Sequence, residues 1–135
     1  MSLQIVRKAL EKHLATLLPA LSIAYENVTF QPVAGVAYMR VNLLPNTPDN
    51  NTQGAAVYWE RGLFQVTLAY PAGTGPAAAD TQAQALRTHY KRGTSMLETG
   101  VTVIVTETPR VSPGFIDGDR FSVPISIPFQ AQINA

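Results

Sequence analysis

The sequence predicts an α+β domain of two layers, in which two helices pack on one face of a mostly antiparallel or mixed sheet. Two segments place apolar residues at the three- and four-residue spacing of an amphipathic helix, and the segments after each of them alternate apolar and polar residues as half-buried strands do. A chain of 135 residues has the usual length of one domain. We therefore expect a single core formed by residues 1–135.

The first predicted helix covers residues 3–18. Its apolar side chains recur every three or four positions, with charged residues between them. Ser2 is expected to cap its N-terminus. Pro19 is expected to end it, because proline has no amide hydrogen and disfavours the helical conformation of the residue before it. The amphipathic pattern indicates that this helix covers a sheet.

The segment after the first helix is predicted to form short strands and a long loop. Residues 21–30 contain short β-favouring pieces, and a turn is expected at residues 31–35. Residues 37–44 alternate as a strand with two distinct faces. Residues 45–54 contain no apolar side chain that could anchor them to a core, so we expect a mobile loop.

A hairpin is predicted around Arg61 and Gly62. Residues 55–60 and 63–70 resemble strands, and glycine can supply the positive φ angle that a tight turn requires. In the second of these strands Phe64 begins an alternating apolar series that continues to Tyr70. Burial of that series fixes the register, because a slip of one residue would expose all of it.

The second predicted helix follows the glycine-rich segment 73–75. Pro76 is expected to be its first residue, and Gly93 is expected to follow its C-terminus. Its apolar face is formed by residues at helical spacing: Ala79, Ala83, Leu86 and Tyr90. This helix completes the layer that covers the sheet.

The last third of the chain is again predicted to form strands. Residues 101–106 are rich in β-branched side chains, and residues 121–133 alternate so that all odd positions are apolar. Pro124 and Pro128 lie at even positions, so the amide hydrogens that they lack belong to the same lateral side of the strand. We expect a sheet edge or a bulge on that side.

The composition excludes several classes of function. Only 14% of the residues are charged and the net charge is +1, which gives no strong field to attract nucleic acid or a membrane surface. The absence of cysteine excludes disulfides and thiolate chemistry. We find no apolar segment that could span a bilayer and expect no signal peptide.

Candidate catalytic and metal-binding residues do not form a recognisable pattern. His13 and His89 are predicted to lie on separate helices as solvent-exposed side chains, and Asp117 and Asp119 flank a glycine that is typical of a turn. The segment 73–75 lacks the remaining residues of a phosphate-binding loop. The sequence therefore predicts no enzyme, no cofactor and no metal site.

A candidate interaction surface is predicted instead. Aromatic and arginine side chains are enriched at protein interfaces, and two neighbouring aromatic residues of a strand point to opposite faces of the sheet. The residues selected on these grounds, together with polar residues of the predicted loop, are Tyr38, Arg40, Asp49, Asn50, Asn51, Tyr58, Trp59 and Arg61.

Several segments taken together resemble a known family. They are the helix at residues 5–18 and segments 25–32, 38–41, 61–66, 70–75, 91–94 and 123–127. In this order they resemble a family of small phage-derived tail proteins, of formerly unassigned function, that is similar to lambda-type tail terminators. The resemblance extends over nearly the whole chain, although these segments mark turns and strands rather than a chemical site.

The resemblance implies a role in the virion tail. Tail terminators are α+β subunits that assemble into a hexameric ring on the finished tail tube, stop its growth and present the surface to which the head docks. The implied partners are further copies of the chain, the tail tube protein and a head-completion or connector protein. The implied location is the virion tail, with assembly in the host cytoplasm and a prophage origin.

Two other interpretations remain open at this stage. A head–tail neck subunit or a tail tube subunit of related topology would share the same features. A small-ligand-binding module or an enzyme with a pocket between helices and sheet belongs to a different class, and it predicts a monomer with a deep polar pocket.

Overall fold

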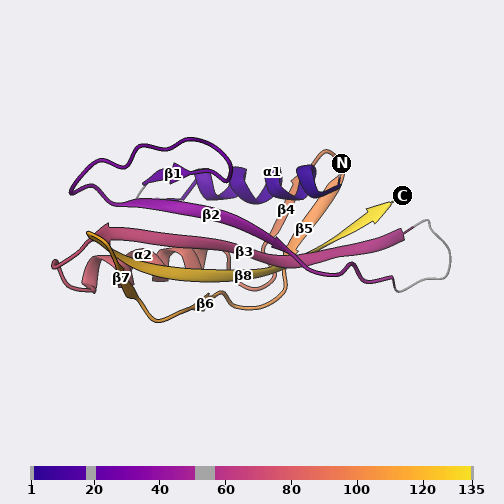
Figure 1. Cartoon of the computed structure of the whole chain (residues 1–135). Helices are drawn as coiled ribbons and strands as arrows, with labels where there is room; N and C mark the ends of the chain where they lie inside the picture. The colour runs from indigo at the N-terminus through magenta and orange to yellow at the C-terminus, as the bar shows by residue number, and fades with distance from the viewer. Residues whose placement is uncertain (1, 18–20, 51–56, 135) are drawn as a thin grey trace.

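The computed structural model describes residues 2–17, 21–50 and 57–134, and it confirms the predicted α+β class. Two helices and eight strands are present in this part of the chain (Figure 1). The helices are α1 (Ser2–Ala15) and α2 (Ala77–His89). The strands are β1 (Ser22–Ala24), β2 (Tyr38–Pro45), β3 (Val57–Pro71), β4 (Ser95–Glu98), β5 (Val101–Val105), β6 (Arg110–Val111), β7 (Phe115–Asp117) and β8 (Arg120–Asn134).

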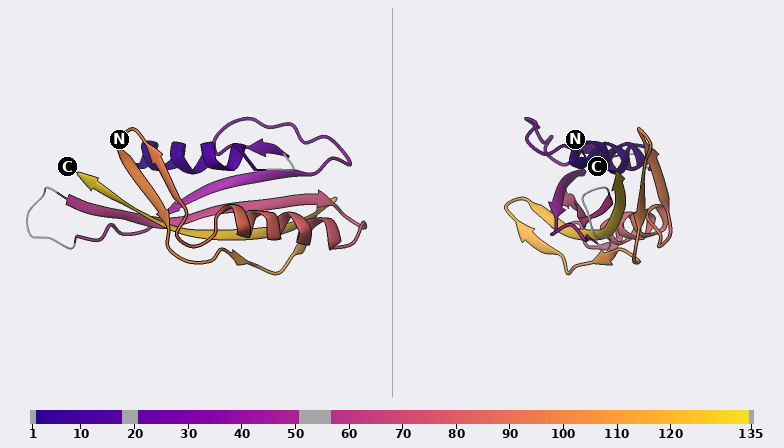
Figure 2. Two further views of the ribbon diagram at one scale, coloured as in Figure 1. Left: turned by 180° about the vertical axis from the view of Figure 1, so that it is seen from behind. Right: turned by 90° about the vertical axis from the view of Figure 1, so that its right-hand side faces the viewer.

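The eight strands form one mixed sheet. Its main order is β1-β2-β3-β8-β5-β4, and β6 and β7 also pair with β8. β1 runs parallel to β2, whereas the other pairs are antiparallel. The sheet curls, as the end-on view in Figure 2 shows. The prediction of a mostly antiparallel or mixed sheet is therefore confirmed.

The predicted hairpin at Arg61 and Gly62 is wrong. Residues 57–71 form one continuous strand of 15 residues, which pairs with β8 from Val57 to Pro71. Gly62 does not have a positive φ angle. A Cβ atom at Gly62 would instead overlap the carbonyl oxygen of Leu44 and lie 3.0 Å from Cα of Pro45. Glycine is required here because β2 passes close to the backbone of β3, not because the chain turns.

β8 confirms the predicted alternation. The side chains at odd positions from Val123 to Ile133 are all buried, and β8 lies between β3 on one side and β5, β6 and β7 on the other. Pro128 and Pro124 each accept one bond on that second side, from the amides of Thr106 at 3.0 Å and Ser112 at 2.9 Å.

On the side of β8 that faces β5, β6 and β7, the strand pairing is interrupted at both prolines. Three short strands pair with residues 120–122, 125–126 and 129–131 of β8, which leaves residues 123–124 and 127–128 between them. Each interval contains one proline, because a residue without an amide hydrogen cannot complete the ladder. Instead of one continuous neighbour, β8 thus has three short strands along the side where an edge or bulge was expected.

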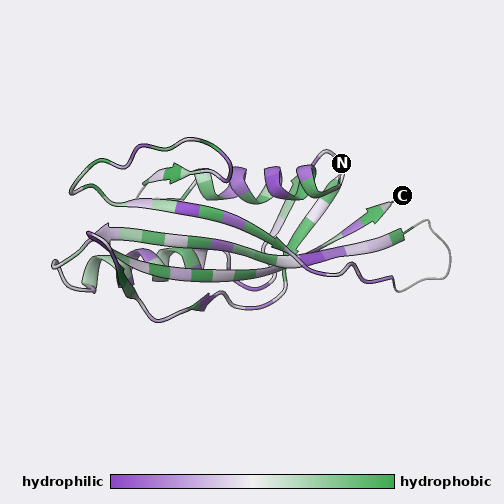
Figure 3. Ribbon diagram, in the orientation of Figure 1, coloured by the Kyte–Doolittle hydropathy of each residue, from purple (hydrophilic) through white to green (hydrophobic). Residues whose placement is uncertain are grey.

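Both helices pack on the inner face of the curled sheet. Val6, Leu10 and Leu14 of α1 and Ala79, Ala83 and Leu86 of α2 belong to the same buried cluster as the inward-facing residues of β2, β3 and β8. Figure 3 shows the alternation of hydrophobic and hydrophilic residues along these strands. The hydroxyl of Tyr90 donates a hydrogen bond of 2.7 Å to the carbonyl of Leu10 and so joins the helices directly. The predicted placement of both helices on one face is confirmed.

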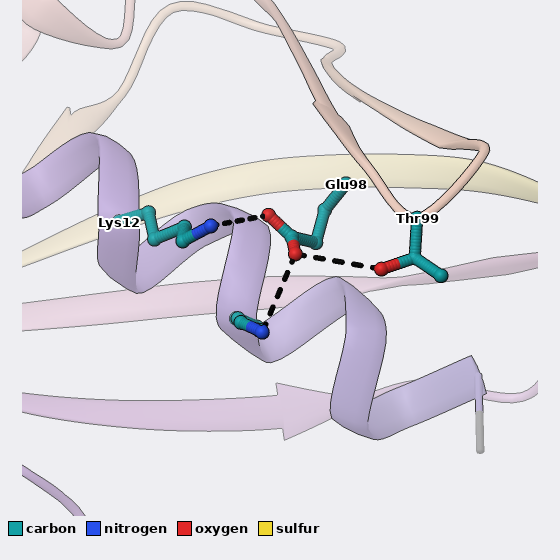
Figure 4. A network of polar contacts seen from close by, with 4 residues as sticks. Lys12, Glu98 and Thr99 are labelled. Carbon is teal, nitrogen blue, oxygen red and sulfur yellow. Dashed lines mark hydrogen bonds and ion pairs between the residues drawn. The ribbon is translucent and has the colours of Figure 1, made fainter.

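Helix α1 also connects the two ends of the sheet. Arg7 binds Glu26, which follows the edge strand β1, at 2.6 Å. Lys12 and Lys8 bind Glu98 of the opposite edge strand β4 at 3.0 and 3.5 Å (Figure 4). The Arg7 guanidinium lowers the pKa of Glu26, and a hydrogen bond from Lys12 lowers that of Glu98. These pairs hold α1 across the open side of the curled sheet.

The helix ends differ in detail from the predictions. α1 begins at Ser2 itself and ends at Ala15, and residues 18–20 lie outside the described residues. Pro76 is the N-cap of α2 rather than its first residue. α2 ends at His89 with Tyr90 as its C-cap, so Gly93 is not the residue that follows the helix. The Gly93 amide donates to Val105 at 2.8 Å, in the turn that leads to β4.

The two histidines are not separate surface side chains, which corrects the sequence-based expectation. The rings of His13 and His89 stack with centroids 4.0 Å apart. The Nε2 atom of His13 lies 2.8 Å from the carbonyl of His89, and that of His89 lies 2.6 Å from the carbonyl of His13. Helical periodicity placed each residue on its own helix correctly, but it contained no information on how the helices meet. The pair fastens the C-terminal ends of α1 and α2 to each other.

Substitution of Gly62 by alanine is expected to destabilise the fold. The added methyl group must displace the backbone of β2 at Leu44, which costs about 2–3 kcal/mol. Urea unfolding measures this loss. The control is Gln65→Ala, three residues along the same strand and on its opposite face, which should change the free energy of unfolding by about 0.5 kcal/mol. Equal effects of the two substitutions would contradict the close approach at Gly62.

Stability is expected to depend on the protonation of His13. Burial is the main effect and lowers the pKa of His13 below its usual 6.5. The hydrogen bond to the backbone of His89 raises this pKa, and the charge of the neighbouring His89 ring lowers it. The unfolded chain therefore takes up this proton at a higher pH than the folded chain does. The contribution to stability is complete above pH 6.5 and is lost as the pH falls through and below this value.

Unfolding free energies measured between pH 7.5 and 5.5 test this dependence. We expect a decrease with falling pH in the natural chain and a smaller decrease in His13→Gln. Glu26 and Glu98 do not contribute in this window, because their lowered pKa values confine their effect to pH below the usual 4.5. An identical decrease in the natural chain and the variant would show that His13 is not the group responsible.

Candidate interaction surface

The residues predicted to form one interaction surface separate into two groups. Tyr38 pairs with Ala69 of β3, whereas Asp49 pairs with Trp59. Ten residues of a continuous strand separate these two positions of β3, which corresponds to about 33 Å. The predicted hairpin at Arg61 would have shortened this distance, and its absence divides the surface.

Tyr38 does not lie on the exposed surface. Its side chain is only 9% exposed and packs with Ala24, Ala69 and Phe30 in a small cluster on the outer face of the sheet. The guanidinium of Arg120 lies 5.1 Å from its ring centroid and donates hydrogen bonds to the carbonyls of Val33 and Val36. These bonds hold the connection between β1 and β2 over the ring. Sequence alternation placed Tyr38 on the outer face correctly but could not show that a loop covers it.

Arg40 remains exposed on that outer face. Its guanidinium carbon lies 5.8 Å from the centroid of the Tyr38 ring. Arg40 and Arg120 thus approach the same ring, which suits the negative face of an aromatic system. Arg40 has a structural contact and is separated from the second group of predicted residues.

The second group belongs to a projecting part of the sheet, here called the arm. The arm consists of residues 46–50, residues 57–62 of β3 and residues 130–134 of β8. Figure 1 shows that β3 and β8 extend beyond α1 on this side of the molecule. The arm contains five of the residues selected from the sequence: Asp49, Asn50, Tyr58, Trp59 and Arg61. Asn51 lies outside the described residues.

Residues 46–49 are bound to β3. The Asn46 amide donates to Arg61 at 2.8 Å, and Asp49 and Trp59 exchange two backbone bonds of 2.9 and 2.8 Å. The Nε atom of Arg61 donates to the carbonyl of Thr47 at 2.9 Å. The first half of the predicted mobile loop therefore follows β3, and residues 51–54 lie outside the described residues. The mobility of the loop stays a prediction.

The two aromatic residues of the arm differ in their surroundings. Tyr58 is half-buried and packs against the main core, and Trp59 points to the opposite face, as alternation requires. Trp59 pairs with Gln132 of β8 and with Asp49, so its position is fixed on both sides. The prediction that the two rings point to opposite faces agrees with this arrangement.

A hollow of about 650 Å³ lies at the base of the arm. Arg61 and Glu107 contribute opposite charges to its lining, and Gly62 contributes only backbone. The other lining residues are Leu44, Pro45, Asn46, Leu63, Thr106, Pro128, Phe129 and Gln130. Only Arg61 of this set was selected from the sequence, because the remaining residues are brought together by the pairing of β2, β3 and β8.

The described part of the chain contains neither a metal-binding cluster nor a helix that could span a membrane. No three His, Asp or Glu side chains in these residues are placed to hold a metal ion. Neither α1 nor α2, the two helices that the structure describes, is long and apolar enough to cross a membrane. Between the helices and the sheet the described side chains form a continuous buried cluster.

Comparison with known proteins assigns the chain to a family. Residues 5–129 match the model of the family described as phage tail terminator protein. The chain belongs to this family. The match extends over nearly all of the residues on which the sequence resemblance was based, so that the resemblance is confirmed. Membership of the phage tail terminator family makes the protein a structural protein of the phage tail.

A solved structure supports the same fold. Its sequence is 27% identical, its TM-score is 0.78, and the similarity covers 100% of this chain and 99% of that chain. No curated protein matches the sequence. The fold is thus shared along the full length of another protein of known structure.

Proposed function

We propose that the protein is a tail terminator subunit that forms a hexameric ring, caps the tail tube and joins it to the head. The observation that carries the proposal is the family match over residues 5–129. In this proposal the chain works through its contact surfaces and catalyses no reaction. Its partners are other copies of itself, the tail tube protein and a head-completion or connector protein. Assembly takes place in the cytoplasm of the bacterial host, from a prophage gene.

The composition supports a protein that acts through contacts. Charged residues make up 14% of the chain, well below the roughly one-quarter of an average soluble domain. A surface with few charges costs less to remove from water when subunits associate. A closed ring needs two different contact surfaces on each subunit, one for each neighbour.

The arm is proposed to be the part that contacts the tail tube. It projects beyond α1, and it combines a half-buried tryptophan with an exposed arginine on one face of the sheet. Tryptophan and arginine are the side chains that most often dominate binding energy at interfaces. Hydrogen bonds from residues 46–49 hold Trp59 and Arg61 in place before any partner binds, which reduces the entropy lost on binding.

Ring formation is tested by mass measurement and electron microscopy of the purified protein, alone and with assembled tail tubes. We expect closed rings of six copies, seen in solution at high concentration or at the ends of the tubes. Tubes incubated with the protein should stop growing when further tube protein is added. A chain that stays monomeric and leaves tube growth unchanged would refute the proposal.

Substitutions in the arm are expected to weaken binding to tail tubes. Trp59→Ala should reduce the affinity by about 2 kcal/mol, or roughly thirtyfold, and Arg61→Glu by about tenfold. Co-sedimentation with assembled tubes measures both effects. Loss of part of the Trp59 contact area should cost about 1 kcal/mol of stability, so thermal unfolding must confirm that each variant is folded.

The matched control for Arg61→Glu is Arg92→Glu. Arg92 is also exposed, and it lies in the turn after α2, outside the arm. Its reversal changes the net charge by the same amount, so a general charge effect would appear in both variants. Equal binding of Arg61→Glu and the natural chain would show that the arm is not the tube contact.

A further inference from the structure

β7 presents an apolar edge to solvent. Phe115 and Ile116 are 49% and 64% exposed, although both belong to a strand. Within the described residues β7 pairs only with β8. Gly114 lies against the ring of Phe121, where a Cβ atom would overlap the ring, so the chain that leads to β7 is held close to the core. The two side chains point to opposite faces of β7, as neighbours in a strand do, so each face of this edge carries one exposed apolar side chain. Exposed apolar side chains at a strand edge are typical of a contact surface.

The turn after β7 adds negative charge to this edge. Asp117 and Asp119 are exposed, and neither carboxylate binds a cationic side chain among the described residues. Arg120, the nearest cation in the sequence, instead donates to the carbonyls of Val33 and Val36. The edge therefore combines an apolar pair with two unbalanced carboxylates.

A groove of about 530 Å³ lies along the outer side of α1. Its apolar lining includes Ala15, Tyr25 and Val28, of which Val28 is 61% exposed. Its polar lining comes from the exposed side of α1 and from the turn after β1: Gln4, Arg7, Lys8, Glu11, Lys12 and Glu26. The positive φ angle of Asn27 turns the chain so that Val28 borders the helix.

Three cations, Arg7, Lys8 and Lys12, lie along this groove beside three carboxylates, Glu11, Glu26 and Glu98, so the charges are equal in number but unevenly paired. Glu26 is bound by Arg7, but the single carboxylate of Glu98 binds both Lys8 and Lys12 (Figure 4). Both lysine side chains are largely exposed. The further carboxylate of the groove, Glu11, is half-buried beside Arg7. The two exposed lysines thus share one carboxylate, whereas Arg7 has two carboxylates beside it.

We propose that neighbouring copies in the ring contact each other through these two surfaces. The β7 edge of one copy packs into the α1 groove of the next, with Ile116 against Tyr25 and Val28. Asp117 then approaches Lys8 and Lys12. The inference rests on the proposed ring and identifies the surfaces that form it.

The positions of the two surfaces suit a ring. Helix α1, which borders the groove, and strand β7 lie on different sides of the molecule, at the top and the bottom of Figure 1. A contact between two different patches is heterologous, and repetition of it produces either a closed ring or a filament. A contact of this kind leaves the arm free, because neither surface includes arm residues.

Cysteine cross-linking tests the contact directly, because the natural chain contains no cysteine. Ile116→Cys and Val28→Cys are prepared as separate single variants, mixed at high concentration with and without tail tubes, and oxidised. We expect mixed disulfide dimers in non-reducing gels. A chain carrying both substitutions should give a ladder of covalent oligomers that ends at the size of the ring.

The outcomes separate this inference from the proposed function. Leu44→Cys, at an exposed apolar residue outside the groove, replaces Val28→Cys as the control and should not cross-link to Ile116→Cys. Rings without a cross-link between positions 116 and 28 would overturn the inference and leave the ring in place. Dimers of Ile116→Cys alone would overturn it too, since they indicate a symmetric contact. Absence of both rings and cross-links would overturn both proposals.

Charge reversal provides an independent readout. Lys8→Glu and Asp117→Lys should each weaken self-association about tenfold in sedimentation equilibrium, and the chain carrying both should recover to within about threefold of the natural chain. Thermal unfolding checks each variant, because Lys8 also binds Glu98. Failure of the second substitution to restore association in a folded chain would contradict the pairing of Asp117 with the groove.

Discussion

The pairing of β3 with β8 is the constraint on which the rest of the structure depends. The two strands are joined over 15 residues, and every other strand of the sheet is attached to one of them directly or through one neighbour. Their register places Phe64 opposite Ile127 and Val66 opposite Ile125, so that buried apolar side chains meet across the middle of the ladder on its inner side. Both helices pack on that side, and the arm is the continuation of the same ladder beyond them.

Local patterns in the sequence predicted the elements better than their arrangement. The alternation in β8 and the helical spacing in α1 and α2 predicted the buried faces, because burial depends on each residue's own polarity. The role of Gly62 could not be predicted in this way, since the atoms that exclude a side chain there belong to Leu44 and Pro45. The β4–β5 hairpin was missed because its turn uses Thr99, which rarely adopts the positive φ angle found here.

The candidate interaction surface was predicted only in part, because residue type does not show which side chains are covered by distant parts of the chain. Residue type identified Trp59 and Arg61, which are neighbours in the arm, but it also selected Tyr38, which a loop covers from the outside. The covering contact comes from Arg120, 82 positions later in the chain than Tyr38 by their numbers, and no local pattern contains it. Phe115 and Ile116 were not selected, since two apolar residues before a turn normally become buried.

The interrupted flank of β8 also affects how the chain can reach its native state. β8 is synthesised after all the other strands, yet it lies at the centre of the sheet and supplies the pairing surface for β3, β5, β6 and β7. Until residues 120–134 emerge from the ribosome, the strand edges that pair with β8 have no partner. Prolines at 124 and 128 make β8, once it has emerged and before it has paired, a poor template for strands of other chains, so the same residues that shape the folded sheet protect the nascent one from aggregation.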